Sequence, residues 1–181
     1  MFDWARGSTL KKLIELQMFQ ATWESRSSLW LKNWHVPWFL GLVDLKPEMC
    51  LLDVGSATPS FIAHVHRTYG CEVHALDADS AAADTRNFGF GHSARDKYPD
   101  VTMHVGFAGD DILPAEKFDI VTCISTLEHT YDHRSPLDRP APMPHLNALR
   151  DMVRMLKPGG VFLMNWDVFL DYMPQRFSLY P

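Results

Sequence analysis

The stretch Met49–Asp79 constrains the fold more than any other part of the chain, because it has the pattern of two strands joined by a helix. The run Met49–Val54 is apolar, short enough for a buried strand, and followed by Gly55. A second apolar run, Cys71–Leu76, is followed by Asp77. Strand–helix–strand units are right-handed and place their two strands parallel in one sheet. The stretch therefore predicts an α/β fold.

The helix between these strands is indicated by its ends and by its spacing. Thr58 is suited to be the N-cap, with Pro59 at the first helical position. Gly70 is suited to a left-handed C-cap. Apolar side chains recur between these ends at helical spacing: Phe61, Ile62, Val65 and Tyr69.

The rest of the chain continues the alternation of helices and strands. The predicted helices are Ser8–Gln20, His35–Val43 (opened by Pro37), Ser80–Asn87 and His145–Leu156, and the further strands are Val101–Val105, Phe118–Ile124 and Val161–Trp166. Lys157–Gly160 is a predicted turn, and the proline-rich segment Thr130–Pro144 a long surface loop. This alternation favours a mostly parallel sheet with helices on both faces.

Length, charge and cysteine content exclude several classes of protein. The 181 residues suit one domain, and the net charge of −5 argues against a nucleic-acid surface. Cys50, Cys71 and Cys123 lie in apolar runs without metal-ligand spacing, which indicates reduced core residues. No signal peptide or membrane-spanning run is present in the sequence, so we expect a cytoplasmic protein.

The N-terminal segment is rich in aromatic residues. Trp23, Trp30, Trp34 and Trp38 lie within residues 23–43, where Lys32 is nearly the sole basic residue. An aromatic helix can lie on a membrane surface, but such helices usually carry a basic face. We therefore favour core packing, or a lid over a site, over membrane contact.

The predicted carboxyl ends of the strands carry the candidate ligand-binding residues. Ligands of open α/β sheets bind at this edge, near the point where the winding direction reverses. Gly55 allows close approach of a ligand to the backbone. Asp77 follows roughly 20 residues later, which is the glycine-to-acid spacing of nucleoside-binding folds. A ribose-binding role for Asp77 is favoured over the alternative that it caps a turn together with Asp79.

These residues resemble the class I S-adenosylmethionine-dependent methyltransferases of the small-molecule type. The resemblance spans roughly residues 45–167 at five places in order: Leu51–Gly55, Leu76–Ala78, Gly106–Ala108, Phe118–His129 and Leu156–Phe162. It implies a Rossmann-like, doubly wound, mostly parallel sheet of strand order 3-2-1-4-5 with N-terminal helices. The implied organisation is a single domain, with a helical cap (1–45), a cofactor-binding core (46–167) and a short tail (168–181).

The resemblance also implies a cofactor, S-adenosylmethionine, and residues that hold it. Its methionine part would lie at Asp53, Gly55, Ser56 and Ala57, its ribose at Asp77 and Ala78, its adenine at Phe107, Ala108 and Asp110, and its methyl group near Ser125. Phe107 stands where relatives have an acid, so Asp110 or Asp111 would accept the adenine amine. The implied partner is a small-molecule methyl acceptor.

His129 is the candidate general base, with Glu128 beside it, because histidine titrates near neutrality. The alternative is a hydrogen-bonded loop histidine. A metal site is another interpretation of this segment, with Glu128, His129, Asp132 and His133 as ligands. We disfavour it because the proline-rich loop prevents the helical i, i+4 geometry that the two histidines would need. We expect no metal.

Two departures from the family pattern leave rival functions open. Ala57 and Pro59 replace loop glycines, and Asp167–Pro181 is too short for the usual terminal helix and antiparallel strand pair. An open edge would favour a homo-oligomer or a partner that completes the sheet. One rival is a non-catalytic or fragmentary partner subunit. The other is a nicotinamide-dependent Rossmann enzyme, although Ala57 and Ser60 occupy two of its three fingerprint glycine positions.

Overall fold

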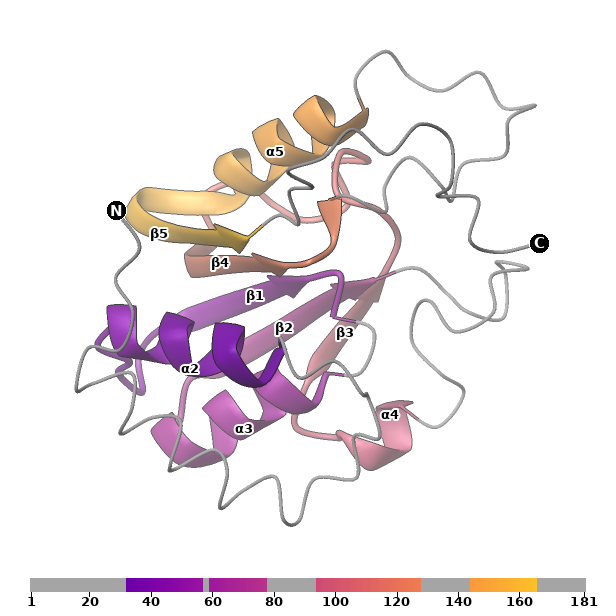
Figure 1. Cartoon of the computed structure of the whole chain (residues 1–181). Helices are drawn as coiled ribbons and strands as arrows, with labels where there is room; N and C mark the ends of the chain where they lie inside the picture. Colours follow the sequence, from indigo (N-terminus) through magenta and orange to yellow (C-terminus); the bar gives the residue numbers. More distant parts are fainter. Residues whose placement is uncertain (1–31, 57–58, 78–93, 128–143, 166–181) are drawn as a thin grey trace, which may run out of the picture.

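A computed structural model describes residues 32–56, 59–77, 94–127 and 144–165. Five strands form one sheet in the order β3-β2-β1-β4-β5, and every neighbouring pair is parallel (Figure 1). The strands are β1 (Cys50–Val54), β2 (Glu72–Asp77), β3 (Thr102–Val105), β4 (Phe118–Ile124) and β5 (Leu156–Asn165). The helices are α2 (Lys32–Leu42), α3 (Ser60–Tyr69), α4 (Ala94–Lys97) and α5 (Pro144–Met155). The predicted Rossmann-like strand order is confirmed.

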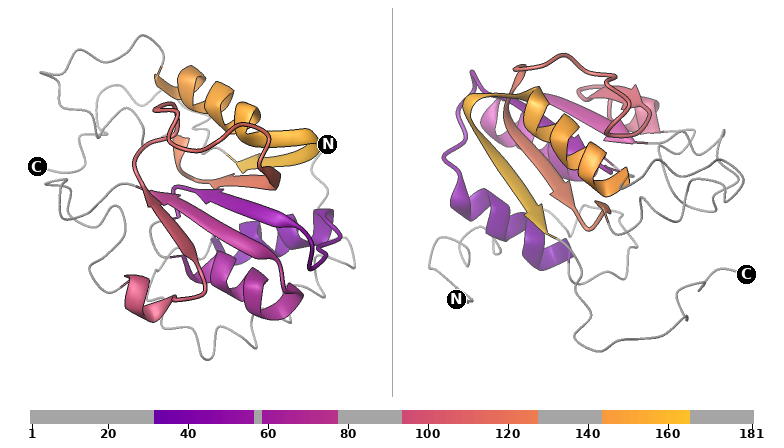
Figure 2. Two further views of the ribbon diagram at one scale, coloured as in Figure 1. Left: turned by 180° about the vertical axis from the view of Figure 1, so that it is seen from behind. Right: turned by 90° about the horizontal axis from the view of Figure 1, so that it is seen from above.

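The helices lie in two layers around the sheet, with α2 and α3 on one face and α5 on the other (Figures 1 and 2). Each face has its own apolar core, because side chains alternate along each strand. Leu51 and Val73 belong to the core under α2 and α3, whereas Leu52 and Val121 belong to the core under α5. The sheet is thus buried on both faces over its centre, as a parallel sheet requires.

The N-terminal helix α2 packs against the sheet core. Val36, Phe39 and Leu40 are buried in the same cluster as Phe61 of α3, and Trp38 packs against it. This contact supports the core-packing interpretation for the described part of the aromatic segment. In the portion of the chain that the structure describes, no helix is long and apolar enough to cross a membrane.

Several predicted element ends need correction. Helix α2 already begins at Lys32, so Pro37 lies inside it and does not open it. Helix α3 begins at Ser60 with Pro59 as its N-cap residue, one position later than predicted, and no side chain caps it. Its predicted end is confirmed: Gly70 has a φ of 78° and its amide donates to the His66 carbonyl at 2.8 Å.

The largest difference is at the start of β5. The strand begins at Leu156, which pairs with Phe118, and the next paired residue is Val161, opposite Ile120. The predicted turn Lys157–Gly160 therefore lies within the ladder as an irregularity, not before it. The predicted bounds of β4 are confirmed, whereas the segments 8–20, 80–87 and 130–143 lie outside the described residues.

Candidate functional site

The carboxyl ends of the strands meet at one edge of the sheet. The register places Val54 of β1 beside both Leu76 of β2 and Cys123 of β4. Chain order reverses between β1 and β4, because β2 and β3 lie on one side of β1 and β4 and β5 on the other. In such sheets the ligand crevice lies at this reversal. Four of the predicted site residues come from the ends of β1, β2 and β4: Asp53, Gly55, Asp77 and Ser125.

Asp53 is buried at the end of β1 and faces the neighbouring strand β4. Its Oδ1 accepts a hydrogen bond of 2.7 Å from the Thr122 hydroxyl, in agreement with the register that pairs the two residues. A buried carboxylate needs donors of this kind to remain charged. Thr122 therefore fixes the orientation of Asp53 just below the strand end.

Gly55 is required by two independent features of the turn after β1. Its φ is +74°, a conformation that residues with a side chain rarely adopt. In addition, a Cβ at this position would lie 2.0 Å from Cγ2 of Thr126. The Gly55 amide donates to the Leu76 carbonyl at 2.8 Å, which holds the turn across the end of β2. Sequence reasoning placed both Gly55 and Thr126 at this edge but did not predict their contact, since only the folded turn brings the two together.

Ser56 carries the feature of this edge that points most directly to a ligand. It is 7% exposed, and its Oγ is the buried side-chain polar atom that has no hydrogen-bond partner within the described ranges. A buried hydroxyl group without a hydrogen-bond partner lowers the free energy of unfolding by about 1–3 kcal/mol. Its place directly after Gly55, at the reversal of the sheet, makes a bound polar group the simplest partner.

Asp77 ends β2 on the next strand along the same edge. Its backbone carbonyl accepts a hydrogen bond of 2.9 Å from the amide of Gly106, which follows β3. Asp77 is half-buried, so one side of the residue reaches solvent. The turn after β1 and the turn after β3 thus lie on either side of Asp77.

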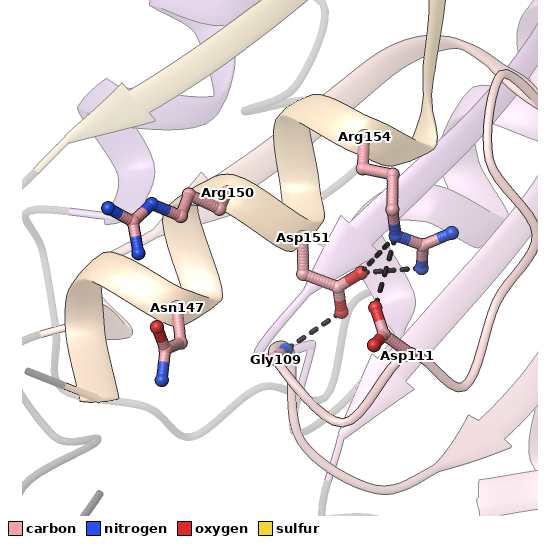
Figure 3. Close-up of a pocket in the computed structure, with 6 residues that line it drawn as sticks. All are labelled: Gly109, Asp111, Asn147, Arg150, Asp151 and Arg154. Carbon is pink, nitrogen blue, oxygen red and sulfur yellow. Dashed lines mark hydrogen bonds and ion pairs between the residues drawn. The ribbon is translucent and has the colours of Figure 1, made fainter. Parts of the chain in front are cut away.

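Helix α5 holds the turn after β3 in place through Asp151 and Arg154, and these contacts are called the clamp below. Asp151 of α5 accepts a hydrogen bond of 2.7 Å from the Gly109 amide, and its other oxygen lies 2.6 Å from Nη2 of Arg154 (Figure 3). Arg154 also donates to the Leu113 carbonyl at 2.7 Å and lies 3.2 Å from Asp111. These contacts border an open pocket that Asn147 and Arg150 complete (Figure 3).

This clamp bears on the predicted adenine region. Phe107 and Ala108 are half-buried in the turn, and the Asp110 amide donates to the Phe107 carbonyl at 3.2 Å. Asp111, one of two candidate acceptors for the adenine amine, is ion-paired with Arg154. Asp110, the other, keeps its predicted role without a test in the structure.

Ser125 is held by a partner that sequence reasoning did not include. It has a φ of +46°, its amide donates to Oδ1 of Asn165 at 2.9 Å, and its hydroxyl accepts from Nδ2 of Asn165 at 3.3 Å. Asn165 is the last residue of β5, so this pair ties the ends of β4 and β5 together. Ala57, Ala78, Glu128 and His129 lie outside the described residues, as do Asp132 and His133.

Comparison with known proteins adds a family match to this geometry. The sequence profile described as a methyltransferase domain matches residues 35–178. No curated protein sequence matches the chain significantly.

Solved structures agree with this match at the level of the fold. A chain of the complex between the Haloferax volcanii Trm112 methyltransferase activator and a protein named as a methyltransferase is 18% identical, with a TM-score of 0.55 over 75% of this chain and 53% of its own. A protein of Bacillus halodurans named as a methyltransferase is 19% identical, with a TM-score of 0.53 over 71% of this chain and 49% of its own. An S-adenosylmethionine-dependent methyltransferase of Thiobacillus denitrificans, solved with S-adenosyl-L-homocysteine, is 16% identical, with a TM-score of 0.51 over 72% of this chain and 46% of its own. The chain thus spans about half the length of these structures.

Proposed function

Since the chain belongs to the methyltransferase domain family, we propose that it binds S-adenosylmethionine at the carboxyl edge of its sheet and transfers the methyl group to a small molecule. The observation that carries this proposal is the buried Ser56 hydroxyl, which lacks a partner among the described residues beside the turn of Gly55. A cofactor with a polar amino-acid end would supply that partner. The proposed organisation is one domain with a cap (1–45), a core (46–167) and a tail (168–181).

The residues along the edge suit the parts of this cofactor in order. Gly55 and Ser56 would hold the methionine part, with Asp53 held by Thr122 beneath the turn. Asp77 would bond the ribose hydroxyls, because a carboxylate can accept from two neighbouring hydroxyl groups. Phe107, Ala108 and Asp110 would border the adenine in the turn that α5 clamps.

The protein's own task in this reaction is positioning. The cofactor would supply an activated methyl group. Holding the two reactants in a fixed orientation lowers the activation free energy by several kcal/mol. Ser125, held by Asn165, would line the crevice near the acceptor. We place His129 as the base for an acceptor that must lose a proton, with Glu128 beside it.

Calorimetry with S-adenosylhomocysteine tests cofactor binding. We expect Asp77→Asn to weaken binding about tenfold or more, since a hydrogen bond to a charged group is worth about 1.5–3 kcal/mol. Asp96→Asn, an exposed carboxylate of α4, should leave binding unchanged. Folded wild-type protein that gives no heat with the cofactor contradicts the proposal.

A second candidate is a binding subunit that works with a partner. It is favoured by one of the structural neighbours, which comes from a complex with an activator. Such a protein would depend on a second chain, or a second copy, that completes the sheet edge. Wild-type protein that binds the cofactor but methylates nothing until a partner is added would support the binding-subunit function.

The other rival is a nicotinamide-dependent enzyme. Quenching of tryptophan fluorescence by a nicotinamide cofactor, and not by S-adenosylmethionine, would support that function.

A further inference from the structure

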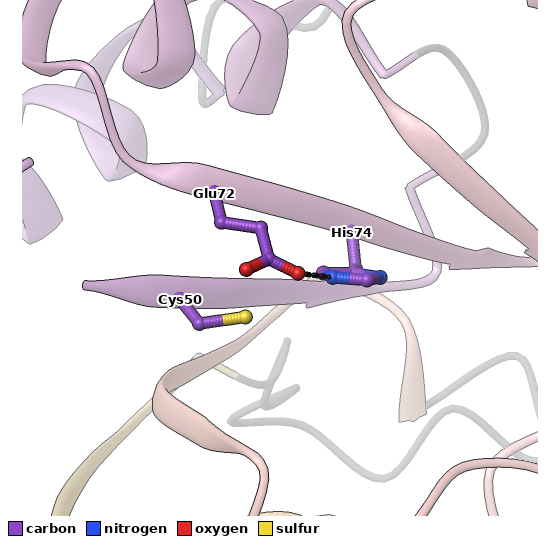
Figure 4. Close-up of side chains that lie close together, drawn as sticks. All are labelled: Cys50, Glu72 and His74. Carbon is purple, nitrogen blue, oxygen red and sulfur yellow. Dashed lines mark hydrogen bonds and ion pairs between the residues drawn. The ribbon is translucent and has the colours of Figure 1, made fainter. Parts of the chain in front are cut away.

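Three metal-ligating side chains converge at the amino end of the sheet, the edge opposite the proposed cofactor site. Cys50 is the first residue of β1 and Glu72 the first of β2, and the register pairs them directly. His74 follows Glu72 by two residues, so its side chain lies on the same face of the strand. All three therefore project from one face of the sheet toward a common point (Figure 4).

The distances between the ligand atoms suit a single small ion. One oxygen of Glu72, one ring nitrogen of His74 and the sulfur of Cys50 all lie within 4.8 Å of one another. Nε2 of His74 and Oε1 of Glu72 are 2.6 Å apart. Both of these are lone-pair atoms that share a proton in the free protein, and a cation can take the place of that proton.

The orientation of His74 is fixed from behind by a second histidine. Nδ1 of His74 lies 2.8 Å from Nε2 of His104 on β3, and the two rings stack with centroids 5.1 Å apart. Metal-binding histidines almost always donate a hydrogen bond from their other ring nitrogen, which fixes the tautomer and the ring plane. Nε2 of His104 lies where it can accept such a bond from Nδ1 of His74. Phe118 packs against the same imidazole in a T-shaped arrangement.

The surroundings leave one side of the cluster open. Cys50 and His74 are buried at 6% and 3% exposure, whereas the side chain of Glu72 is 61% exposed. Burial lowers the pKa of His74 and thereby favours the neutral imidazole that a metal requires. Burial likewise raises the pKa of the Cys50 thiol to about 11, so an ion must displace its proton. The Lys117 ammonium, 3.7 Å from Glu72, competes for the same carboxylate.

We propose that Cys50, Glu72 and His74 form a binding site for a dication of the zinc type. Sulfur, imidazole nitrogen and carboxylate oxygen are the donors that Zn²⁺ prefers, and three protein ligands leave a fourth position for water on the side of Glu72. Binding releases the thiol proton, and Lys117 turns to solvent. Nε2 of His74 gives up its proton to bind the ion, and the imidazole stays neutral because Nδ1 takes a proton from Nε2 of His104, whose ring regains one from solvent at Nδ1. This site is independent of the proposed methyl transfer, because it lies at the other end of the strands.

Titration of the whole chain with Co²⁺, followed by competition with Zn²⁺, tests the site. We expect a single equivalent of cobalt to produce a thiolate-to-metal charge-transfer absorption that zinc abolishes. Cys50→Ser should remove this absorption, while Cys71→Ser, a buried cysteine on the opposite face, should retain it. Wild-type protein that binds cobalt without this absorption overturns the proposal.

A second pair of variants keeps the test decisive where Cys50→Ser fails to fold. Glu72→Gln changes an exposed side chain and should weaken zinc binding about tenfold or more in calorimetry. Glu48→Gln removes another exposed carboxylate nearby and should leave zinc affinity unchanged. Equal zinc affinity of Glu72→Gln and Glu48→Gln contradicts the site.

Discussion

Gly55 and Gly159 allow steric crowding to be separated from backbone strain, because both have positive φ, +74° and +81°, in different surroundings. A Cβ at Gly55 meets the Thr126 side chain at 2.0 Å, whereas a Cβ at Gly159 meets nothing within 4 Å. We expect Gly159→Ala to lower the free energy of unfolding by about 1 kcal/mol from φ alone. Gly55→Ala should cost roughly 2–4 kcal/mol, since overpacking adds to the strain.

Urea denaturation of both variants measures this difference. Gly55→Ala combined with Thr126→Gly should recover part of the loss, because the second change removes the crowding atoms. Equal costs at Gly55 and Gly159 would show that Thr126 moves aside freely.

Sequence patterns identified the residues at strand ends but not what those residues contact. Gly55 and Asp77 follow from apolar runs and from glycine-to-acid spacing along the chain, and Asp53 follows from the family resemblance. The contacts at this edge come from strands that are distant in sequence. Thr122 bonds to Asp53, Thr126 lies against Gly55, and Asn165 bonds to Ser125. Side-chain partners of this kind depend on tertiary packing, so periodicity cannot reveal them.

At the scale of an element, helix α2 offers a test of core packing. Phe39 is 1% exposed among the α3 side chains, whereas Leu42 of the same helix is 46% exposed. We expect Phe39→Ala to lower the free energy of unfolding by about 3–5 kcal/mol, as large core truncations do. Leu42→Ala should cost well under about 1 kcal/mol, as surface changes do. A Phe39 variant as stable as the Leu42 variant would show that α2 contributes no core.

The clamp of α5 on the turn after β3 gives a second prediction. Asp151→Asn should lower the free energy of unfolding by about 1.5–3 kcal/mol, because it weakens charge-assisted bonds from Gly109 and Arg154. Hydrogen exchange of the Gly109 amide should become faster, since this amide loses its charged acceptor. Arg150→Gln, an exposed change on the same helix, is the matched control. Unchanged exchange at Gly109 would mean that other contacts hold the turn.

The elements were predictable wherever one feature of the sequence decides them. The apolar run of β4 and the left-handed Gly70 after α3 are local signals, and both were predicted at the correct residues. The start of β5 was not, because Leu156 joins the ladder by pairing with Phe118 across the irregular segment. Pro37 similarly misled the prediction of α2, since a proline can start a helix or lie within one.

At the scale of the whole molecule, strand order could be predicted but the clustering at the amino edge could not. The order is what the family resemblance implies, and the strand–helix–strand rule adds that strands joined in this way are parallel. Cys50, in contrast, was predicted to be a core residue, because its spacing from Glu72 and His74 along the chain gives no sign that the three meet. Their meeting depends on the pairing of β1 with β2, which is a property of the folded sheet.

The two proposed sites lie at opposite ends of β1, and this separation predicts that they act independently. From Cys50 to Gly55 the strand spans about 16 Å at roughly 3.3 Å per residue. Sites more than about 10 Å apart without shared partners usually contribute additively. S-adenosylhomocysteine at about one hundred times its dissociation constant should add about 2.7 kcal/mol to the free energy of unfolding. Saturating zinc should add its own increment, and the two should sum when both are present.

Thermal unfolding with each ligand and with both measures additivity, and calorimetry with S-adenosylhomocysteine in zinc-saturated protein measures coupling directly. We expect the cofactor affinity to change by less than about twofold, because the two sites share no residue and lie at opposite ends of β1. Glu72→Gln, which keeps the cofactor edge intact, serves as the control for zinc bound elsewhere. A larger change in cofactor affinity, lost in Glu72→Gln, would mean that β1 transmits the state of its amino end to the turn of Gly55.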